Sequence, residues 1–260
     1  MIVVFRGKLF ALFKKCLEAI LEGSEQALLT FTASGTQIQS VDVLSVCMYV
    51  VNFHKSQFAR YNVSKQYQVQ VGVDNLFYFV KRCKNQTITF KTKKSNLWVY
   101  TGSGSLSAGD RGNCYKLSGK LQERSVYYSL PNEVFSHCPS FALHPLEFTN
   151  MMLELSVGGG YIDLTMEGTE TLWQTRFETG IISLRALNGG GEGYRVLTPA
   201  KEKFQNRYIT KYLKQACGIA QSCKRVVVYL RPEGPLLLNF EMSPKTTPLL
   251  TVSIAPTKRS

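Results

Sequence analysis

The chain has 260 residues, 44% of them hydrophobic, which is enough for one large core or for two ordinary domains. Lys and Arg number 31 against 18 Asp and Glu, and the net charge of +13 favours a polyanionic partner: nucleic acid, an acidic membrane surface or an acidic protein. No stretch reaches the roughly 20 unbroken apolar residues of a membrane span, and the N-terminal stretch does not follow the order of a secretory signal, so we expect a soluble intracellular protein.

The first element is an amphipathic helix around LFKKCLEAIL, residues 12–21. Apolar residues recur at helical spacing and predict a buried face: Leu9, Leu12, Phe13, Cys16, Leu17 and Ile20. Lys14, Lys15 and Glu18 fall on the opposite face. For one helix alone, solvated surface charge is the simplest interpretation of these two lysines.

A unit of one helix followed by a strand hairpin recurs along the chain. The first helix precedes an alternating segment with a turn at Ser34-Gly35, and DNLFYFVKRCKNQ precedes the hairpin TITFKTKKSNLWVYTG. PLEFTNMMLELS precedes a hairpin turning at Glu167-Gly168, and RYITKYLKQAC precedes one turning at Glu233-Gly234. Glycine after a polar residue suits such turns because it takes positive φ at no steric cost. Four units predict an α+β fold in two similar halves.

Basic residues recur opposite the apolar face in two further predicted helices. In the second helix Lys81 and Lys84 share a stripe, and in the fourth Arg207, Lys211 and Lys214 do so. If these helices lie on one side of a sheet, their lysines and arginines form a positive surface that suits phosphates rather than bases. The third helix differs, because Glu147, Asn150 and Glu154 occupy its polar stripe.

We predict an N-terminal domain over 1–117, an extended connector over 118–136 and a C-terminal domain over 137–260. The connector has Gly119, Pro131 and no helical period. Seven cysteines without a C-x-x-C pair indicate reduced thiols, buried where the pattern is apolar. The apolar patterns hold Cys16, Cys47, Cys83 and Cys217. We expect no metal site, no cofactor and no catalytic residue, because the three histidines do not cluster.

Taken in order, these segments resemble the eukaryotic-type DNA sliding clamp, the proliferating cell nuclear antigen family. LFKKCLEAIL looks like the clamp's first helix, and GTQIQSVDVLSV is similar to its strand G-x-x-L-Q-S-M-D-x-x-x-V. VGVDNLFYFVKRCKNQTITFK, RYITKYLKQA, EGPLLLNFEM and SIAPTK are similar to the second helix, the fourth helix, the last strands and the tail. The resemblance is collinear over nearly the whole chain.

The resemblance implies two clamp domains with helices on one face of a continuous antiparallel sheet, and three chains closing a ring around duplex DNA. Such a clamp is a DNA polymerase processivity factor, not an enzyme; it acts in the nucleus or at a site of viral replication and is placed on DNA by a clamp loader. Carried over by position, the residues facing DNA are Lys14, Lys15, Lys81, Lys84, Arg207, Lys211 and Lys214.

The resemblance also implies a pocket beneath the connector that takes short aromatic-bearing peptides from the polymerase and other partners. The matching positions are Val41, Val46, Met48, Pro235, Ile254, Ala255 and Pro256. Ordinary core packing is the competing interpretation of each. Clamps of this family are usually acidic outside the hole, so the charge of +13 and the third helix indicate a divergent member, such as one from a virus.

Other functions fit parts of the sequence. The chain could be one subunit of a heterotrimeric checkpoint clamp, a monomeric processivity or transcription factor of clamp topology, or a plain basic nucleic-acid-binding protein. An enzyme is disfavoured: Ser136-His137-Cys138 are adjacent in the chain, whereas triads assemble across space. The glycine runs also lack the Lys-Ser/Thr ending of a phosphate-binding loop.

Overall fold

The structure is a computed structural model that describes residues 1–83, 86–93, 96–101, 113–117, 137–188, 193–232, 234–242 and 249–257. The chain divides into two compact units, each described by itself below. The first contains Met1–Ser45 and Tyr49–Tyr127, and the second contains Val46–Met48 and Tyr128–Ser260. The connector predicted over 118–136 lies outside the described residues, so the three domain bounds stay predictions.

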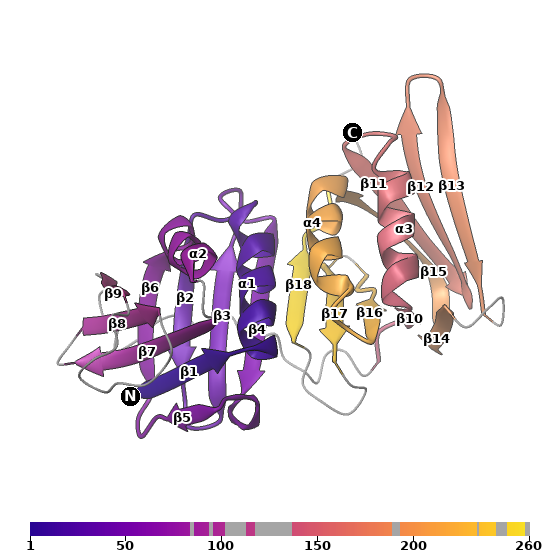
Figure 1. Ribbon diagram of the computed structural model, residues 1–260. Helices are drawn as coiled ribbons and strands as arrows, with labels where there is room; N and C mark the ends of the chain where they lie inside the picture. Colours follow the sequence, from indigo (N-terminus) through magenta and orange to yellow (C-terminus); the bar gives the residue numbers. More distant parts are fainter. Residues whose placement is uncertain are drawn as a thin grey trace. The chain divides into compact units, whose positions relative to one another are not determined.

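The first unit has two α-helices, α1 (Lys8–Leu21) and α2 (Val73–Arg82), which pack against each other (Figure 1). One antiparallel sheet has the order β5-β1-β7-β8-β9. Its strands are β1 (Ile2–Arg6), β5 (Arg60–Asn62), β7 (Thr87–Lys93), β8 (Asn96–Thr101) and β9 (Asn113–Leu117). A second row has the order β4-β3-β2-β6. It consists of β2 (Gln26–Phe31), β3 (Gly35–Val41), β4 (Cys47–His54) and β6 (Tyr67–Gly72); the short 3₁₀ turn η1 (Lys55–Gln57) follows β4.

The second unit has α3 (Pro145–Leu155) and α4 (Thr210–Ala220), which lie side by side (Figure 1). One row of strands has the order β14-β10-β16-β17-β18. Its members are β10 (Ser140–Leu143), β14 (Tyr194–Thr198), β16 (Arg225–Tyr229), β17 (Leu236–Glu241) and β18 (Leu250–Ile254). The antiparallel sheet β13-β12-β11-β15 consists of β11 (Tyr161–Gly168), β12 (Glu170–Phe177), β13 (Gly180–Leu187) and β15 (Ala200–Ile209).

The two units repeat one topology, strand for strand. Each strand of the first unit has its counterpart nine strands later: β5-β1-β7-β8-β9 corresponds to β14-β10-β16-β17-β18, and β4-β3-β2-β6 corresponds to β13-β12-β11-β15. In the same way α1 and α2 correspond to α3 and α4. The predicted α+β clamp fold of two similar halves, with helices packed on antiparallel sheets, is confirmed.

Local sequence explains the hairpins. Gly168 has φ 56° at the turn between β11 and β12, where a residue with a Cβ would be strained. The predicted turn at Ser34-Gly35 joins β2 to β3, with Thr32 N donating to the Gly35 carbonyl at 2.9 Å. The turn predicted at Glu233-Gly234 is described only in part, because Glu233 is outside the described residues.

Each unit has an aromatic core beneath its helices. In the first unit Phe5 of β1 has its ring centroid 4.4 Å from that of Phe13 on α1 and 5.3 Å from that of Phe53 on β4. In the second, the fully buried Trp173 of β12 meets Phe141 of β10 edge to face at 6.1 Å. The contact of Phe13 holds one side of α1 in the core, so the opposite side of that helix is left exposed.

The buried cysteines include one with a strongly shifted pKa. Cys16, Cys47, Cys83 and Cys217 are thiols outside any disulfide and are buried, as predicted. Burial raises the pKa of the Cys217 thiol to about 12, although the Lys214 charge lowers it in part. The reactive thiolate is therefore almost absent at pH 8.

We expect Cys217 to stay unlabelled by an aromatic disulfide reagent at pH 8 in the folded protein, and to react fully in denaturant. Peptide mass spectrometry after timed quenching measures the labelling. The partly exposed Cys223 provides the internal comparison. Labelling of Cys217 at the rate of Cys223 would contradict the burial.

Among the described residues, no helix is long and apolar enough to cross a membrane.

Candidate nucleic-acid interface

Helix α1 turns its lysines away from the core. Its apolar face is buried from Leu9 to Ile20. Lys15 is exposed, and Lys14 is partly exposed with its Nζ 4.0 Å from Glu18 Oε1 one turn on. Such an i, i+4 pair on the surface is weak and leaves Lys14 able to exchange partners. Lys8, at the first position of the helix, is also exposed and lies two turns before Lys15. The seven-residue spacing in the sequence could have added Lys8 to the predicted set.

Helix α2 ends at Arg82, so the predicted stripe is shorter than expected. Lys81 is exposed in the last turn. Lys84 comes after the helix and lies outside the described residues. Arg82 was not among the predicted residues. It is exposed, and its guanidinium carbon lies 4.1 Å from the centroid of the Tyr78 ring. This cation–π contact holds a second positive charge at the same end of the helix.

Helix α4 begins three residues later than the periodicity predicted. Lys211 and Lys214 are exposed on it, while Tyr212, Leu213 and Ala216 are buried. Arg207 is not on this helix, and its prediction as part of the helical stripe is wrong. It belongs to β15, whose pairing with β11 continues to its last residue, Ile209, opposite Tyr161. Strand hydrogen bonding to β11 outweighs the helical spacing over residues 207–209.

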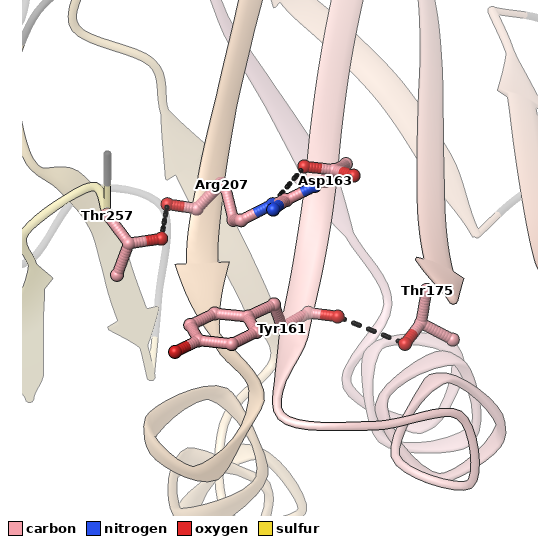
Figure 2. Close-up of polar contacts among 5 residues, drawn as sticks. All are labelled: Tyr161, Asp163, Thr175, Arg207 and Thr257. Atoms are coloured by element: carbon pink, nitrogen blue, oxygen red, sulfur yellow. Dashed lines mark hydrogen bonds and ion pairs between the residues drawn. The ribbon is translucent and has the colours of Figure 1, made fainter. Parts of the chain in front are cut away.

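The side chain of Arg207 is bound to a carboxylate (Figure 2). Its Nε is 2.8 Å from Asp163 Oδ1, and its Nη2 is 3.0 Å from Asp163 Oδ2. Only 23% of the Arg207 side chain and 9% of the Asp163 side chain are exposed. Hydrogen bonding to Asp163 raises the pKa of the Arg207 guanidinium, although burial opposes this. A two-pronged, largely buried pair of this kind neutralises Arg207, so we remove Arg207 from the candidate phosphate contacts.

Helix α3 exposes a different chemistry. Glu147, Asn150 and Glu154 are exposed, as their polar stripe predicted. Beside this stripe lie Leu146, 57% exposed, and Leu153, 50% exposed. The helix contains neither Lys nor Arg. Its open face is therefore apolar and acidic, next to the basic face of α4.

Most, but not all, of the residues predicted to form the peptide pocket have exposed or partly exposed side chains. Pro235, Ala255 and Pro256 are partly exposed in the second unit. Val46 and Met48, also partly exposed, group with that unit, and the Ala255 amide donates to the Val46 carbonyl at 2.8 Å. Val41 is exposed and belongs to the first unit.

Ile254 is a correction to the pocket set. It is the last residue of β18, is fully buried, and pairs in register with Leu236 of β17. Its side chain belongs to the core of the second unit, so no partner can contact it without rearrangement. The connector expected to cover the pocket lies outside the described residues, and the pocket stays a prediction.

Comparison with known proteins places this geometry in a class. Residues 5–99 match the family described as proliferating cell nuclear antigen, N-terminal domain. The probable DNA polymerase sliding clamp 1 of Paramecium bursaria Chlorella virus 1 is 20% identical over 230 residues, 86% of this chain and 85% of the viral protein. The crystal structure of the PCNA2–PCNA3 complex from Sulfolobus tokodaii has a chain of the same fold. It superposes with a TM-score of 0.79 over 98% of this chain and 99% of that one, at 17% identity.

The duplicated α+β topology is thus that of a sliding clamp. The match to the proliferating cell nuclear antigen family covers residues 5–99, and the likeness of fold to a sliding clamp extends over nearly the whole chain. Proteins of this family are not enzymes, which agrees with the expectation from the sequence.

Proposed function

We propose that this chain is a processivity factor that holds a DNA polymerase on duplex DNA through contacts with phosphates. The observation that carries the proposal is the division of α1, α2 and α4 into a buried apolar face and an exposed face with lysines. Those lysines are Lys14, Lys15, Lys81, Lys211 and Lys214.

Lysine suits this task for a physical reason. Its ammonium group is a point charge on a flexible stem, so it contacts any phosphate oxygen without requiring one geometry. Contacts of this kind give affinity without sequence information, and the affinity falls steeply as salt rises. A protein held in this way can move along the duplex while its tethered polymerase stays at high effective concentration.

The proposed assembly is a homotrimeric ring closed head to tail around DNA. Among the described residues, β9 at one end of its sheet and β13 at one end of another each have a strand neighbour on one side only. Open strand edges are templates for pairing with another chain. A head-to-tail contact between β13 of one copy and β9 of the next would use both edges, and a threefold rotation would close the ring.

We expect the mass in solution to be that of three chains, about 88 kDa given 29.3 kDa each. Light scattering after size exclusion at micromolar concentration measures it, with and without duplex DNA. A strictly monomeric species under both conditions would refute the ring. It would leave two candidates, a monomeric DNA-binding factor of clamp topology and one subunit of a heterotrimeric clamp.

A heterotrimeric clamp is the second candidate, and the open face of α3 favours it. Because that face carries no cation, three identical chains would bring three apolar and acidic strips to the proposed hole. Partner subunits with other sequences would avoid this. The same mass measurement on the isolated chain separates the two candidates, since a subunit of a heterotrimer would not form a trimer alone.

Partner docking is proposed at the surface of Val46, Met48, Pro235, Ala255 and Pro256, with Val41 and the connector as further parts. An apolar floor beside an extended segment suits a short peptide whose aromatic side chains enter the floor. The polymerase and a clamp loader are the proposed partners, and the nucleus or a site of viral DNA replication is the proposed location.

A further inference from the structure

The segment after β18, Ala255–Thr257, is held at both of its ends within the second unit. The Ala255 amide donates to the Val46 carbonyl at 2.8 Å. The Thr257 amide donates to the Arg207 carbonyl at 2.8 Å, and the Thr257 hydroxyl donates to the same oxygen at 3.3 Å (Figure 2). We call this segment the tail. The second anchor depends entirely on where β15 presents the Arg207 carbonyl.

Strand β15 lies at the end of its sheet. Among the described residues its strand neighbour is β11, and its other edge receives Thr257. Arg207 and Asp163 stand opposite each other in the β11–β15 register. Because the Arg207 carbonyl points to the tail and not to β11, this match is a non-hydrogen-bonded pair, the kind in which opposite side chains are closest.

At this position the ion pair, and not a backbone hydrogen bond, links Arg207 to β11. The Arg207 guanidinium donates two hydrogen bonds to the Asp163 carboxylate of β11, while the Arg207 carbonyl accepts a hydrogen bond from the Thr257 amide of the tail. The guanidinium carbon of Arg207 also lies 5.9 Å from the ring centroid of Tyr161, another residue of β11. Loss of either charged partner would leave the other half-buried and uncompensated, which would move the β15 backbone at residue 207.

We infer that the Arg207–Asp163 pair is a positioning device for partner binding: it fixes the β15 edge to which the tail is tied, and so fixes Ala255 and Pro256 for an incoming peptide. Arg207 thus acts through the tail and not through DNA. The inference rests on the proposed docking surface, but its structural half can be tested without any partner.

The test compares Asp163→Asn with a matched control, Glu241→Gln. Glu241 forms an ion pair with Arg225 at 2.7 Å between β16 and β17 of the same unit, with similar exposure of both partners, and neither residue contacts the tail by a hydrogen bond that the structure describes. We expect Asp163→Asn to speed hydrogen exchange at the Thr257 amide at least tenfold, measured by NMR. We expect Glu241→Gln to leave it within twofold of wild type.

The second readout is binding of a fluorescein-labelled synthetic peptide that carries two phenylalanines. We expect at least tenfold weaker binding to Asp163→Asn, and unchanged binding to Glu241→Gln. Arg207→Lys keeps the charge but loses the two-pronged geometry, so it should lie between wild type and Asp163→Asn in both readouts. This milder variant keeps the test open if Asp163→Asn does not fold.

Three results would overturn the inference. The first is unchanged Thr257 exchange in Asp163→Asn or, if that variant does not fold, in Arg207→Lys. The second is equal acceleration in Glu241→Gln. The third is a DNA-binding salt slope reduced by about one in Arg207→Gln, which removes the charge; this would make Arg207 a phosphate contact. Failure of the peptide to bind wild type would instead refute the proposed docking surface. The exchange data would then still decide whether the pair positions the tail.

Discussion

Replacing Lys14, Lys81 and Lys214 together by Ala is expected to weaken duplex DNA binding and to flatten its salt dependence. Each lysine that neutralises a phosphate releases a counterion, and contributes about 0.9 to the slope of log affinity against log salt. The plot for the variant should therefore be shallower by about 3 for each chain that contacts DNA. Fluorescence anisotropy with a short labelled duplex between 50 and 200 mM salt is the measurement. All three side chains are at least partly exposed, so the fold should stay intact.

The control changes the same charge elsewhere. Lys65, Lys201 and Lys224 are exposed and lie outside the four α-helices. Their joint replacement by Ala removes the same net charge, but we expect it to change the slope by less than about one. If both triple variants behave alike, the overall charge of +13 determines DNA binding, and the helix faces have no special role.

The sequence predicted the helices well because their apolar periodicity reflects local packing. The buried face of α1 follows the spacing from Leu9 to Ile20, and the whole predicted face is buried. The polar stripe of α3 was also placed correctly at Glu147, Asn150 and Glu154. Periodicity reports which side of a helix meets the core, and that is a property of residues close in sequence.

Features that depend on pairing with residues far away in the chain could not be predicted from the sequence. Arg207 was assigned to a helix because Tyr208 and Tyr212 fit the helical period; pairing with β11, more than 40 residues away, keeps it in a strand. Ile254 was assigned to a pocket by its position in the family resemblance, yet its pairing with β17 buries it. In both cases strand register decides the environment, and register is set by the partner strand.

The strand-for-strand repeat was visible only in outline for a related reason. Helix and hairpin signals marked four units, but the short strands β5 and β14, of three and five residues, carry too little alternation to stand out. With them in place, α3 is the counterpart of α1. The same position in the two repeats therefore presents lysines in one unit and leucines with glutamates in the other.

That contrast leads to an expected gain of function. Replacing Asn150 by Lys and Leu153 by Arg gives two cations to the exposed face of α3, which packs against the lysine-bearing helix α4. If α3 faces DNA as its counterpart α1 is proposed to, the salt slope should steepen by about 2 for each chain that contacts DNA, and affinity at 50 mM salt should rise by at least one to two orders of magnitude. Both positions are exposed, so neither change disturbs the core.

The matched control places equivalent charges on a strand face. Gln205→Lys on β15 together with Leu197→Arg on β14 uses exposed positions, again one amide and one leucine. We expect this variant to raise affinity by no more than a few fold, through net charge alone. Equal gains from both variants would mean that α3 does not lie against the duplex. The absence of any gain from the α3 variant, with its fold intact, would mean that the open face of α3 is turned away from DNA, and the leucines there would then need a protein partner to cover them.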